Sequence, residues 1–158
     1  SSAASDVYKR QVDHILERFT GIALQNTRGL DQLYHFTELA FPPQSPIQYV
    51  QVHFFHEGHP SDRRFDPKNA TVVLDLSTTR LGDLWISLGM RAGLCTCWFR
   101  TTQPHVAEAI QAEAHQLVKA LADAGYAGAH VGVTLWDGDR LRETAELMRR
   151  FAGIDVNA

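Results

Sequence analysis

The 158-residue sequence is poor in the features that mark catalytic, nucleic-acid-binding and membrane proteins. Lysine and arginine total 15 against 18 aspartates and glutamates, so the formal net charge is −3 and no broad basic surface is expected for nucleic acid or anionic lipid. No apolar run approaches the roughly 20 residues that cross a bilayer. A glycine-rich phosphate loop, a nucleophile elbow and a paired-carboxylate signature are also missing. These absences favour a binding protein over an enzyme, and no cofactor is expected.

Cysteine is scarce, and its two occurrences are Cys95 and Cys97. They stand two residues apart in a predicted strand, so their side chains share one face at a separation of about 6.6 Å along the strand. This spacing lies at the far limit of disulfide geometry. We therefore expect two reduced, buried cysteines, which suggests a reducing compartment.

The first eleven residues, Ser1 to Gln11, resemble an adapter-derived peptide that recurs at the ends of proteins translated from environmental sequence assemblies. The segment has no apolar stretch of the kind that a signal peptide requires. We expect residues 1–11 to be non-native and the natural protein to extend further at its N-terminus.

The apolar fraction of 44% is enough to form a core, and its first periodicity is helical. Apolar residues recur at steps of three and four from Val12 to Ala23, and a weaker pattern of the same kind runs from Leu30 to Ala40. Three prolines between Phe41 and Pro46 then end helix formation. Residues 12–46 are predicted to be a helical segment followed by a proline-rich linker.

Beyond the linker the period changes to two, which is typical of strands. Four runs of alternating apolar residues follow, and the first two are separated by a polar loop from His56 to Asn69. Gly89 and Gly93 are placed where the last two of these strands would turn. The predicted strands cover residues 47–55, 72–76, 84–88 and 95–99.

A long helix and a closing strand complete the predicted core. Pro104 opens the helix, the apolar stripe is Val106, Ile110, Leu117 and Leu121, and Gly125 stands at the position of a left-handed cap. A strand over Val131 to Leu135, a turn over 137–139 and a polar helix from Arg140 to Phe151 follow.

The predicted fold class is α+β, with a mainly antiparallel four- to five-stranded sheet packed by one long helix in the order β-β-β-β-α-β. N-terminal helices and a C-terminal helix flank it. Residues 47–136 form the predicted core domain, and residues 137–158 the C-terminal helix and tail.

His53, His56 and His59 are the strongest candidates for chemistry, because three imidazoles beside Glu57 are able to bind Zn²⁺. A small metal-dependent hydrolase is therefore an alternative function. The known zinc motif places two histidines four apart on a helix, whereas these are three apart and run from a strand into a loop. The spacing favours solvent-facing side chains at a strand end, so no metal site is predicted.

Asp137, Asp139 and Glu143 form a second acidic group, which raises the alternative of a Ca²⁺ or acid–base site. The segment lacks the further oxygen ligands of an EF-hand. A turn followed by acids at a helix N-terminus is the preferred interpretation.

Trp85 and Trp98 fall opposite the aliphatic positions of their strands. They belong either to a second buried face beneath the N-terminal helices or to an exposed surface for a partner. Burial is favoured, because large aromatic side chains usually find cover. Both remain candidates for partner contact.

The order and spacing of these elements resemble the C-terminal domain of flagellar hook-length control proteins, over roughly Ile47 to Leu135. The resemblance is carried by alternating aliphatics, then Leu-Gly, a second alternating strand, and a helix with Leu-x3-Leu before a glycine and a short strand. A departure is Ser77 to Arg80, where many members have a proline. The matching residues are Val72, Leu74, Leu76, Leu81, Gly82, Leu84, Ile86, Leu88, Val106, Ile110, Leu117, Leu121 and Gly125.

The Leu-Gly pair has a physical reading that does not depend on the family. Leu81 is able to anchor the connection between two strands in the core, and Gly82 fits a backbone position with positive φ or a close neighbour. Both roles are structural, so no catalytic residue is expected among them.

The resemblance implies a domain that meets the cytoplasmic domain of a flagellar export-gate component and switches export away from hook subunits. It also implies a protein made in the bacterial cytoplasm and then secreted through the flagellar apparatus. Needle-length control in a virulence-type secretion system is a related alternative, and a structural module with another partner is a third, because fold alone does not fix function.

Overall fold

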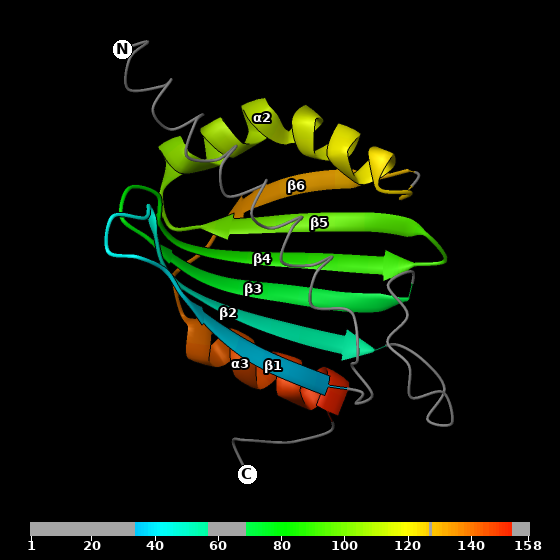
Figure 1. The fold of residues 1–158 in the computed structure, drawn as a ribbon, viewed down its shortest axis with the longest axis horizontal. Helices are drawn as coiled ribbons and strands as arrows, with labels where there is room; N and C mark the ends of the chain where they lie inside the picture. Colours follow the sequence, from blue (N-terminus) through cyan, green and yellow to red (C-terminus); the bar gives the residue numbers. More distant parts are fainter. Residues whose placement is uncertain (1–33, 57–68, 127, 153–158) are drawn as a thin grey trace.

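The computed structural model describes residues 34–56, 69–126 and 128–152, which form one curved sheet with helices on its two faces (Figure 1). In chain order the elements are β1 (Tyr34–Ala40), β2 (Ile47–His56), β3 (Ala70–Thr78), β4 (Gly82–Arg91), β5 (Leu94–Thr101), α2 (Pro104–Asp123), β6 (His130–Leu135), α3 (Arg140–Leu147) and a π-helical turn, η1 (Met148–Ala152).

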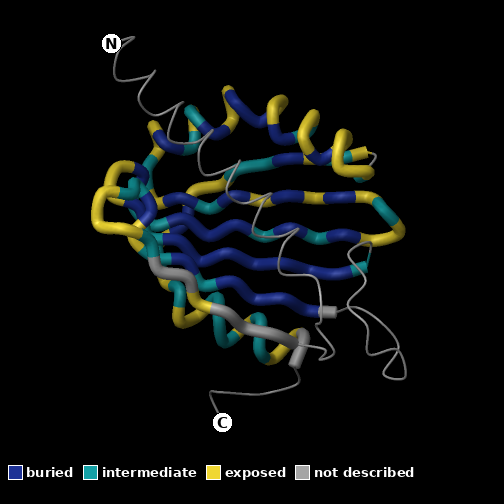
Figure 2. The backbone as a smooth tube through the Cα atoms, in the orientation of Figure 1, coloured by how far each residue is buried: buried dark blue, intermediate teal, exposed yellow. Residues whose placement is uncertain are grey.

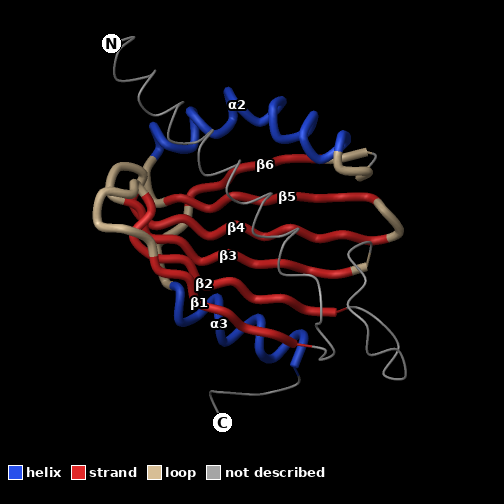
Figure 3. Tube along the Cα trace, viewed as in Figure 1, coloured by secondary structure: helices blue, strands red, loops and turns tan. Residues whose placement is uncertain are grey.

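The strands lie in the sheet in the same order as in the chain, β1-β2-β3-β4-β5-β6. Neighbours from β1 to β5 pair antiparallel, whereas β6 pairs parallel to β5 after the chain has returned through α2. A parallel pair needs such a crossover, because a tight turn can join only antiparallel strands. The α+β class and the β-β-β-β-α-β core are confirmed, and β1 brings the sheet to six strands (Figure 3).

The helical prediction for Leu30 to Ala40 is wrong from Tyr34 onward. This segment is β1, and it pairs with β2 from Tyr34↔Phe55 to Ala40↔Tyr49. Pairing with β2 along all seven residues outweighs a weak helical period, because strand formation depends more on cross-strand neighbours than on local propensity. The proline-rich segment is the connection between two paired strands, where the amide of Ser45 donates to the carbonyl of Pro42 at 2.9 Å. The helix predicted over Val12 to Ala23 lies outside the described residues.

The main core lies between α2 and one face of the sheet, which we call the α2 face (Figure 2). Each buried apolar side chain of this kind contributes about 1.5–3 kcal/mol relative to exposure. The predicted stripe of α2 is confirmed, since all four of its aliphatic residues are buried. The core includes Val72, Leu74, Leu76, Leu84, Ile86, Leu88, Cys95, Cys97, Phe99, Val106, Ile110, Leu117, Leu121 and Val131.

The Leu-Gly pair closes the turn between β3 and β4. Leu81 is buried in the core, and its amide donates to Oγ1 of Thr78 at 3.0 Å. Gly82 has a φ of 71°, and a Cβ there would lie 2.6 Å from Nε2 of Gln103. Gln103, the residue before α2, donates this amide to the carbonyl of Leu81 at 3.3 Å. Both expectations for Gly82, a positive φ and a close neighbour, are confirmed, and the turn is fixed to the start of α2.

The ends of α2 follow the predicted signals. Pro104 is its first residue, and Gly125 follows the C-cap with a φ of 100°. The amide of Tyr126 donates to the carbonyl of Leu121 at 2.9 Å, and that of Gly125 to Ala122 at 3.0 Å. This pair of bonds is a Schellman motif, which ends a helix on a left-handed residue.

The β4–β5 turn is a two-residue loop in which Ala92 and Gly93 both have positive φ, 51° and 81°. Two positive values define the type I′ turn, whose twist matches that of the paired strands. Gly93 is in the turn as predicted, but Gly89 lies within β4, in register with Thr96.

Substitution of Gly82 by alanine should destabilise the domain more than the same change at Gly93. Both positions have positive φ, which costs about 1 kcal/mol for a residue with a Cβ, but only at Gly82 does the new Cβ meet another side chain. We expect losses of about 2 kcal/mol for Gly82→Ala and about 1 kcal/mol for Gly93→Ala in urea unfolding.

The control is Gly82→Ala placed in a Gln103→Ala background, where the close neighbour is absent. The cost of the glycine substitution should fall there to about 1 kcal/mol, the value set by backbone conformation alone. An equal cost in both backgrounds would show that Gln103 does not restrict this turn.

Candidate functional site

Within the described residues, α3 covers one half of the second face of the sheet, which we call the α3 face. Trp85 and Trp136 lie at 6.0 Å between ring centroids and form a small apolar cluster with Phe55, Val73 and the partly buried Leu147 of α3. Trp85 is 2% exposed, so its predicted burial is confirmed. Among the described residues its cover includes the C-terminal helix, because α3 folds back under the sheet after β6 (Figure 1), while the predicted N-terminal helices lie outside those residues.

Ion pairs hold α3, which has no fully buried residue of its own. Arg140 lies 3.0 Å from Asp75 of β3 and 3.2 Å from Asp83 of β4, while Arg100 of β5 lies 2.5 Å from Glu143. The Asp75 side chain is buried at the centre of the sheet. Burial raises the pKa of the Asp75 carboxyl above its ordinary value, and the charge of Arg140 offsets this shift in part.

The acids before and within α3 serve the helix itself. Asp139 is its N-cap and accepts from the amide of Arg142 at 3.1 Å. The Arg142 guanidinium donates to both carboxylate oxygens of Asp137 at 2.8 Å, and the Asp139 amide donates to the same group at 3.0 Å. These bonds, led by those from Arg142, lower the pKa of Asp137 to about 2. The interpretation of a turn followed by capping acids is confirmed at Asp139.

The prediction of a solvent-facing side chain is wrong for His53, which is buried on the α3 face of β2. Its ring is stacked on Phe55 at 6.4 Å and tilted to Trp85 at 6.5 Å. Burial lowers its pKa from 6.5 to about 4, so the ring is neutral at physiological pH. His56 is the last residue of β2, and His59 lies outside the described residues. Within the described ranges, no three histidine, cysteine or acidic side chains gather as a metal site would require.

Cys95 and Cys97 are both free and buried on the α2 face, as expected. Burial raises the pKa of the Cys95 thiol to about 11 and that of Cys97 further. A thiol that does not ionise near neutral pH is a poor nucleophile. The two residues therefore act as small apolar groups of the core.

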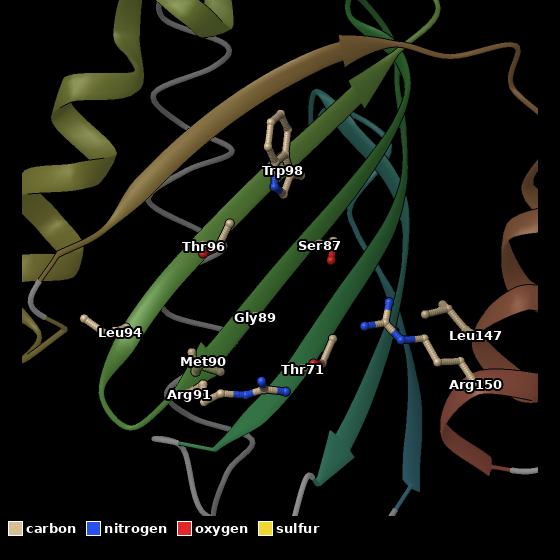
Figure 4. A pocket seen from close by; sticks show the side chains of 10 residues that line it. All are labelled: Thr71, Ser87, Gly89, Met90, Arg91, Leu94, Thr96, Trp98, Leu147 and Arg150. Carbon is tan, nitrogen blue, oxygen red and sulfur yellow. The ribbon is translucent and has the colours of Figure 1, made fainter.

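The half of the α3 face that no described helix covers carries a groove of about 410 Å³ (Figure 4). Trp98 and Leu94, both from β5, are 41% and 59% exposed and stand on one side of it, so the predicted burial is wrong for Trp98. Leu147 and Arg150 stand on the other side, where α3 passes into η1. The partner contact predicted for Trp85 or Trp98 therefore rests on Trp98, since Trp85 is enclosed.

Trp98 lies across the backbone of the edge strand β6. A Cβ on Gly132, its register partner, would lie 2.3 Å from an indole carbon, so only glycine admits this position. The indole also meets the ring of His130 edge-on at 5.9 Å. Alternation in the sequence places Trp98 opposite the aliphatic residues of its strand. The glycine beneath its indole can be recognised only from the strand register.

These features define an α+β domain in which Asp75, Asp139, Arg140 and Glu143 stabilise the fold and one sheet face carries the exposed apolar side chains of Leu94 and Trp98. Residues 61–140, just over half of the chain, match the family described as Flagellar hook-length control protein FliK. The chain belongs to this family, and its role is in the control of flagellar hook length.

No curated protein and no solved structure matched the chain. The family description is flagellar, which agrees with the resemblance in the sequence and gives no support to needle-length control or a hydrolase. Among the helices of the described ranges, none has the length and apolar character needed to cross a bilayer.

Removal of Arg140 should destabilise the domain more at neutral pH than in acid. An ionised Asp75 that has lost its buried partner is costly, whereas a protonated one is not, so the loss is present at pH 7 and shrinks as the carboxyl takes up a proton. For Arg140→Gln we expect the free energy of unfolding in urea to fall by about 2 kcal/mol at pH 7. This loss is smaller than for a fully buried pair, because Arg140 is partly exposed.

The double variant Asp75→Asn with Arg140→Gln is the matched control, because it removes both charges. It should recover part of the stability at pH 7 and show little added pH dependence. A loss for Arg140→Gln that is independent of pH would contradict this account of how α3 is held.

His53 should make the protein less stable as the pH falls below 6.5. The unfolded chain protonates this imidazole near pH 6.5, whereas the folded protein resists until about pH 4. The contribution of His53 to the free energy of unfolding is therefore complete above pH 6.5 and declines toward pH 4, with a loss of about 2 kcal/mol at pH 5. The measurement is urea unfolding of the parent and of His53→Gln at pH 7 and at about pH 5. The difference between the two proteins isolates His53, because the other titrating groups contribute equally to both. Parallel pH dependences would rule out a buried neutral imidazole.

Proposed function

We propose that this domain controls hook length by binding the cytoplasmic domain of a flagellar export-gate component, and that binding switches export from hook subunits to later subunits. The protein would act in the bacterial cytoplasm and then leave through the same apparatus. Catalysis has no part in this function.

The family match carries the proposal, and the half of the α3 face that no described helix covers supports it. Exposed tryptophan and leucine side chains on a rigid sheet are well suited to protein contact, because they bury large area at little loss of conformational freedom. Groups that elsewhere perform chemistry are committed to the fold here: Asp75 pairs with Arg140, and Cys95 and Cys97 fill the core.

The direct test is calorimetric titration of the full chain, with and without residues 1–11, into the cytoplasmic domain of the cognate export-gate component. We expect saturable binding that is unchanged by removing residues 1–11. Well-folded protein that gives no heat and no co-elution would overturn the proposed partner.

The cellular test replaces Trp98 by alanine in the flagellated source bacterium and measures hook length by electron microscopy. If the exposed face makes the contact, hooks should become longer and less uniform and filament should be reduced. Leu141→Ala is the matched control, because Leu141 is an exposed apolar residue of α3 that does not line the groove. Normal hooks in the Trp98 variant, with protein level unchanged, would count against this face.

A further inference from the structure

β6 is one edge of the described sheet, and one side of its backbone faces away from β5. The amide of Trp136, directly after β6, donates to the carbonyl of Thr101 at 2.8 Å, so it faces β5. Successive residues of a strand direct their amide and carbonyl groups to alternate sides. Counting back along β6, the backbone groups of Val131, Val133 and Leu135 therefore face outward. Within the described residues, no strand pairs with this side.

The edge strand β6 lacks the proline, the charge and the bulge that commonly protect such a strand from pairing with another chain. Its sequence, HVGVTL, contains no proline and no lysine, arginine, aspartate or glutamate. Its register with β5 runs from Thr96↔His130 to Thr101↔Leu135 without a shift. The opposite edge strand, β1, carries the exposed Glu38. Because proteins use these features to prevent edge-to-edge association, their lack leaves β6 able to accept a further strand.

Exposure along β6 increases toward its C-terminal end. Val131 is 9% exposed and Val133 is partly buried, whereas Leu135 is 60% exposed. These three side chains alternate with Gly132 and Thr134 and lie on the α2 face, so the cover on that face decreases along the strand. The open part of the edge is therefore its second half.

Trp98 provides an apolar surface on the α3 face of this open edge. Its indole lies across β6, and three ring carbons, Cζ3, Cε3 and Cη2, would lie within 2.8 Å of a Cβ on Gly132. Paired strands lie about 4.8 Å apart, so a side chain in the same row of a seventh strand would lie next to the outer edge of the indole. The ring is 41% exposed, and Leu135 offers a second exposed apolar side chain on the opposite face.

We propose that β6 binds an extended segment of a partner protein as a seventh strand of the sheet. The segment forms main-chain hydrogen bonds with Val133 and Leu135 and places an apolar side chain against Trp98. It is uncharged where it meets β6, because β6 has no charged side chain to pair with. Strand addition of this kind gains affinity from the backbone and specificity from alternate side chains. The proposal rests on the proposed function, for which it names the surface and the conformation of the segment recognised.

An extended segment fits this edge better than a helix or a second copy of the chain does. A helix satisfies its own backbone groups and leaves those of β6 unpaired. A second copy that pairs through β6 brings its own α2 to the same edge, where α2 already lies alongside β6 (Figure 1). A single strand needs a width of only about 4.8 Å beside β6 and avoids this conflict.

The first measurement is amide hydrogen exchange of the full chain by NMR, alone and with the cytoplasmic domain of the export-gate component. In the free protein, the amides of Val133 and Leu135 should exchange faster than that of Thr134, which faces β5. In the complex, the exchange of the two outward amides should slow at least tenfold, while that of Thr134 changes little. Slow exchange of Val133 and Leu135 already in the free chain overturns the proposal.

Proline variants test the outward amides by affinity, measured by calorimetry. Val133→Pro removes an outward donor without removing a β5–β6 hydrogen bond, and proline is tolerated on the outer side of an edge strand. Val133→Ala is the matched control, because it shortens the same side chain and keeps the amide. The proline variant should bind the export-gate domain about tenfold more weakly than the alanine variant.

Leu135→Pro and Leu135→Ala repeat this comparison at an exposed position, where the fold is less affected by the substitution. Circular dichroism and urea unfolding confirm that each variant is folded. Equal affinities within both pairs of folded variants overturn the proposal.

Gly132→Ala tests the contact with Trp98 and leaves every outward amide in place. The new Cβ would overlap the indole, so the ring must leave its position over β6. Because the ring is partly exposed, it can move into solvent while the fold is retained. Gly132→Ala and Trp98→Ala should each weaken binding about tenfold. Affinity equal to that of the parent in both variants overturns the contact assigned to Trp98.

A synthetic peptide separates this proposal from the proposed function. The probe is an eight-residue peptide of alternating threonine and valine, and its control is the same peptide with every backbone amide N-methylated. The first should slow exchange at Val133 and Leu135, and the second should not, because it has no donors for pairing.

The outcomes distinguish the two proposals. Slowed exchange with the peptide, together with no binding of the export-gate domain, supports strand addition and overturns the proposed partner. Binding of the export-gate domain without slowed exchange at Val133 and Leu135 overturns strand addition and leaves the proposed function intact. No effect of either probe overturns both. A dimer of the chain in light scattering that is lost in Val133→Pro assigns the edge to a second copy and also overturns the proposal.

Discussion

The alternation of side chains between two faces of the sheet is the constraint on which the structure depends. Each strand from β2 to β5 presents apolar residues to both faces for part of its length, so both need cover. The long helix α2 covers one face with an aliphatic stripe. In the part of the chain that the structure describes, the short helix α3 covers half of the other. The difference in how far the two helices cover their faces produces both the tryptophan cluster and the groove beside it.

The two helices are held to the sheet by different forces. α2 is held by buried aliphatic surface, which is insensitive to charge. α3 has a mostly polar surface and depends on Arg140 and Glu143, which reach Asp75, Asp83 and Arg100. A helix attached through ion pairs is the more easily displaced of the two, since partly exposed pairs contribute little. The wall of the groove that α3 supplies is therefore the less rigid wall.

The core elements were predictable because their local signals agree with their final environment. The alternating residues Val72, Leu74 and Leu76 form part of a central strand. Pro104 begins α2 and Gly125 follows its end, as their backbone preferences require. β1 was missed because the three-residue spacing of Phe36 and Leu39 favours one face of a helix and puts the two side chains on opposite sides of a strand. Only pairing with β2 reveals the strand.

The site was less accessible from the sequence. The polar sequence of α3 gives no sign that it covers Trp85, because its contacts are mostly ionic and lie far away in the chain. The groove floor depends on the register that places Thr71, Gly89 and Thr96 in one row, and turn geometry sets that register.

The strand order also bears on how the chain reaches its native state. Since every strand lies next to its neighbour in sequence, each new strand can add to a free edge of those already formed. No strand must insert between two others, and only β6 has to wait for a helix. Such sequential assembly keeps contacts local, which shortens the search for the folded state.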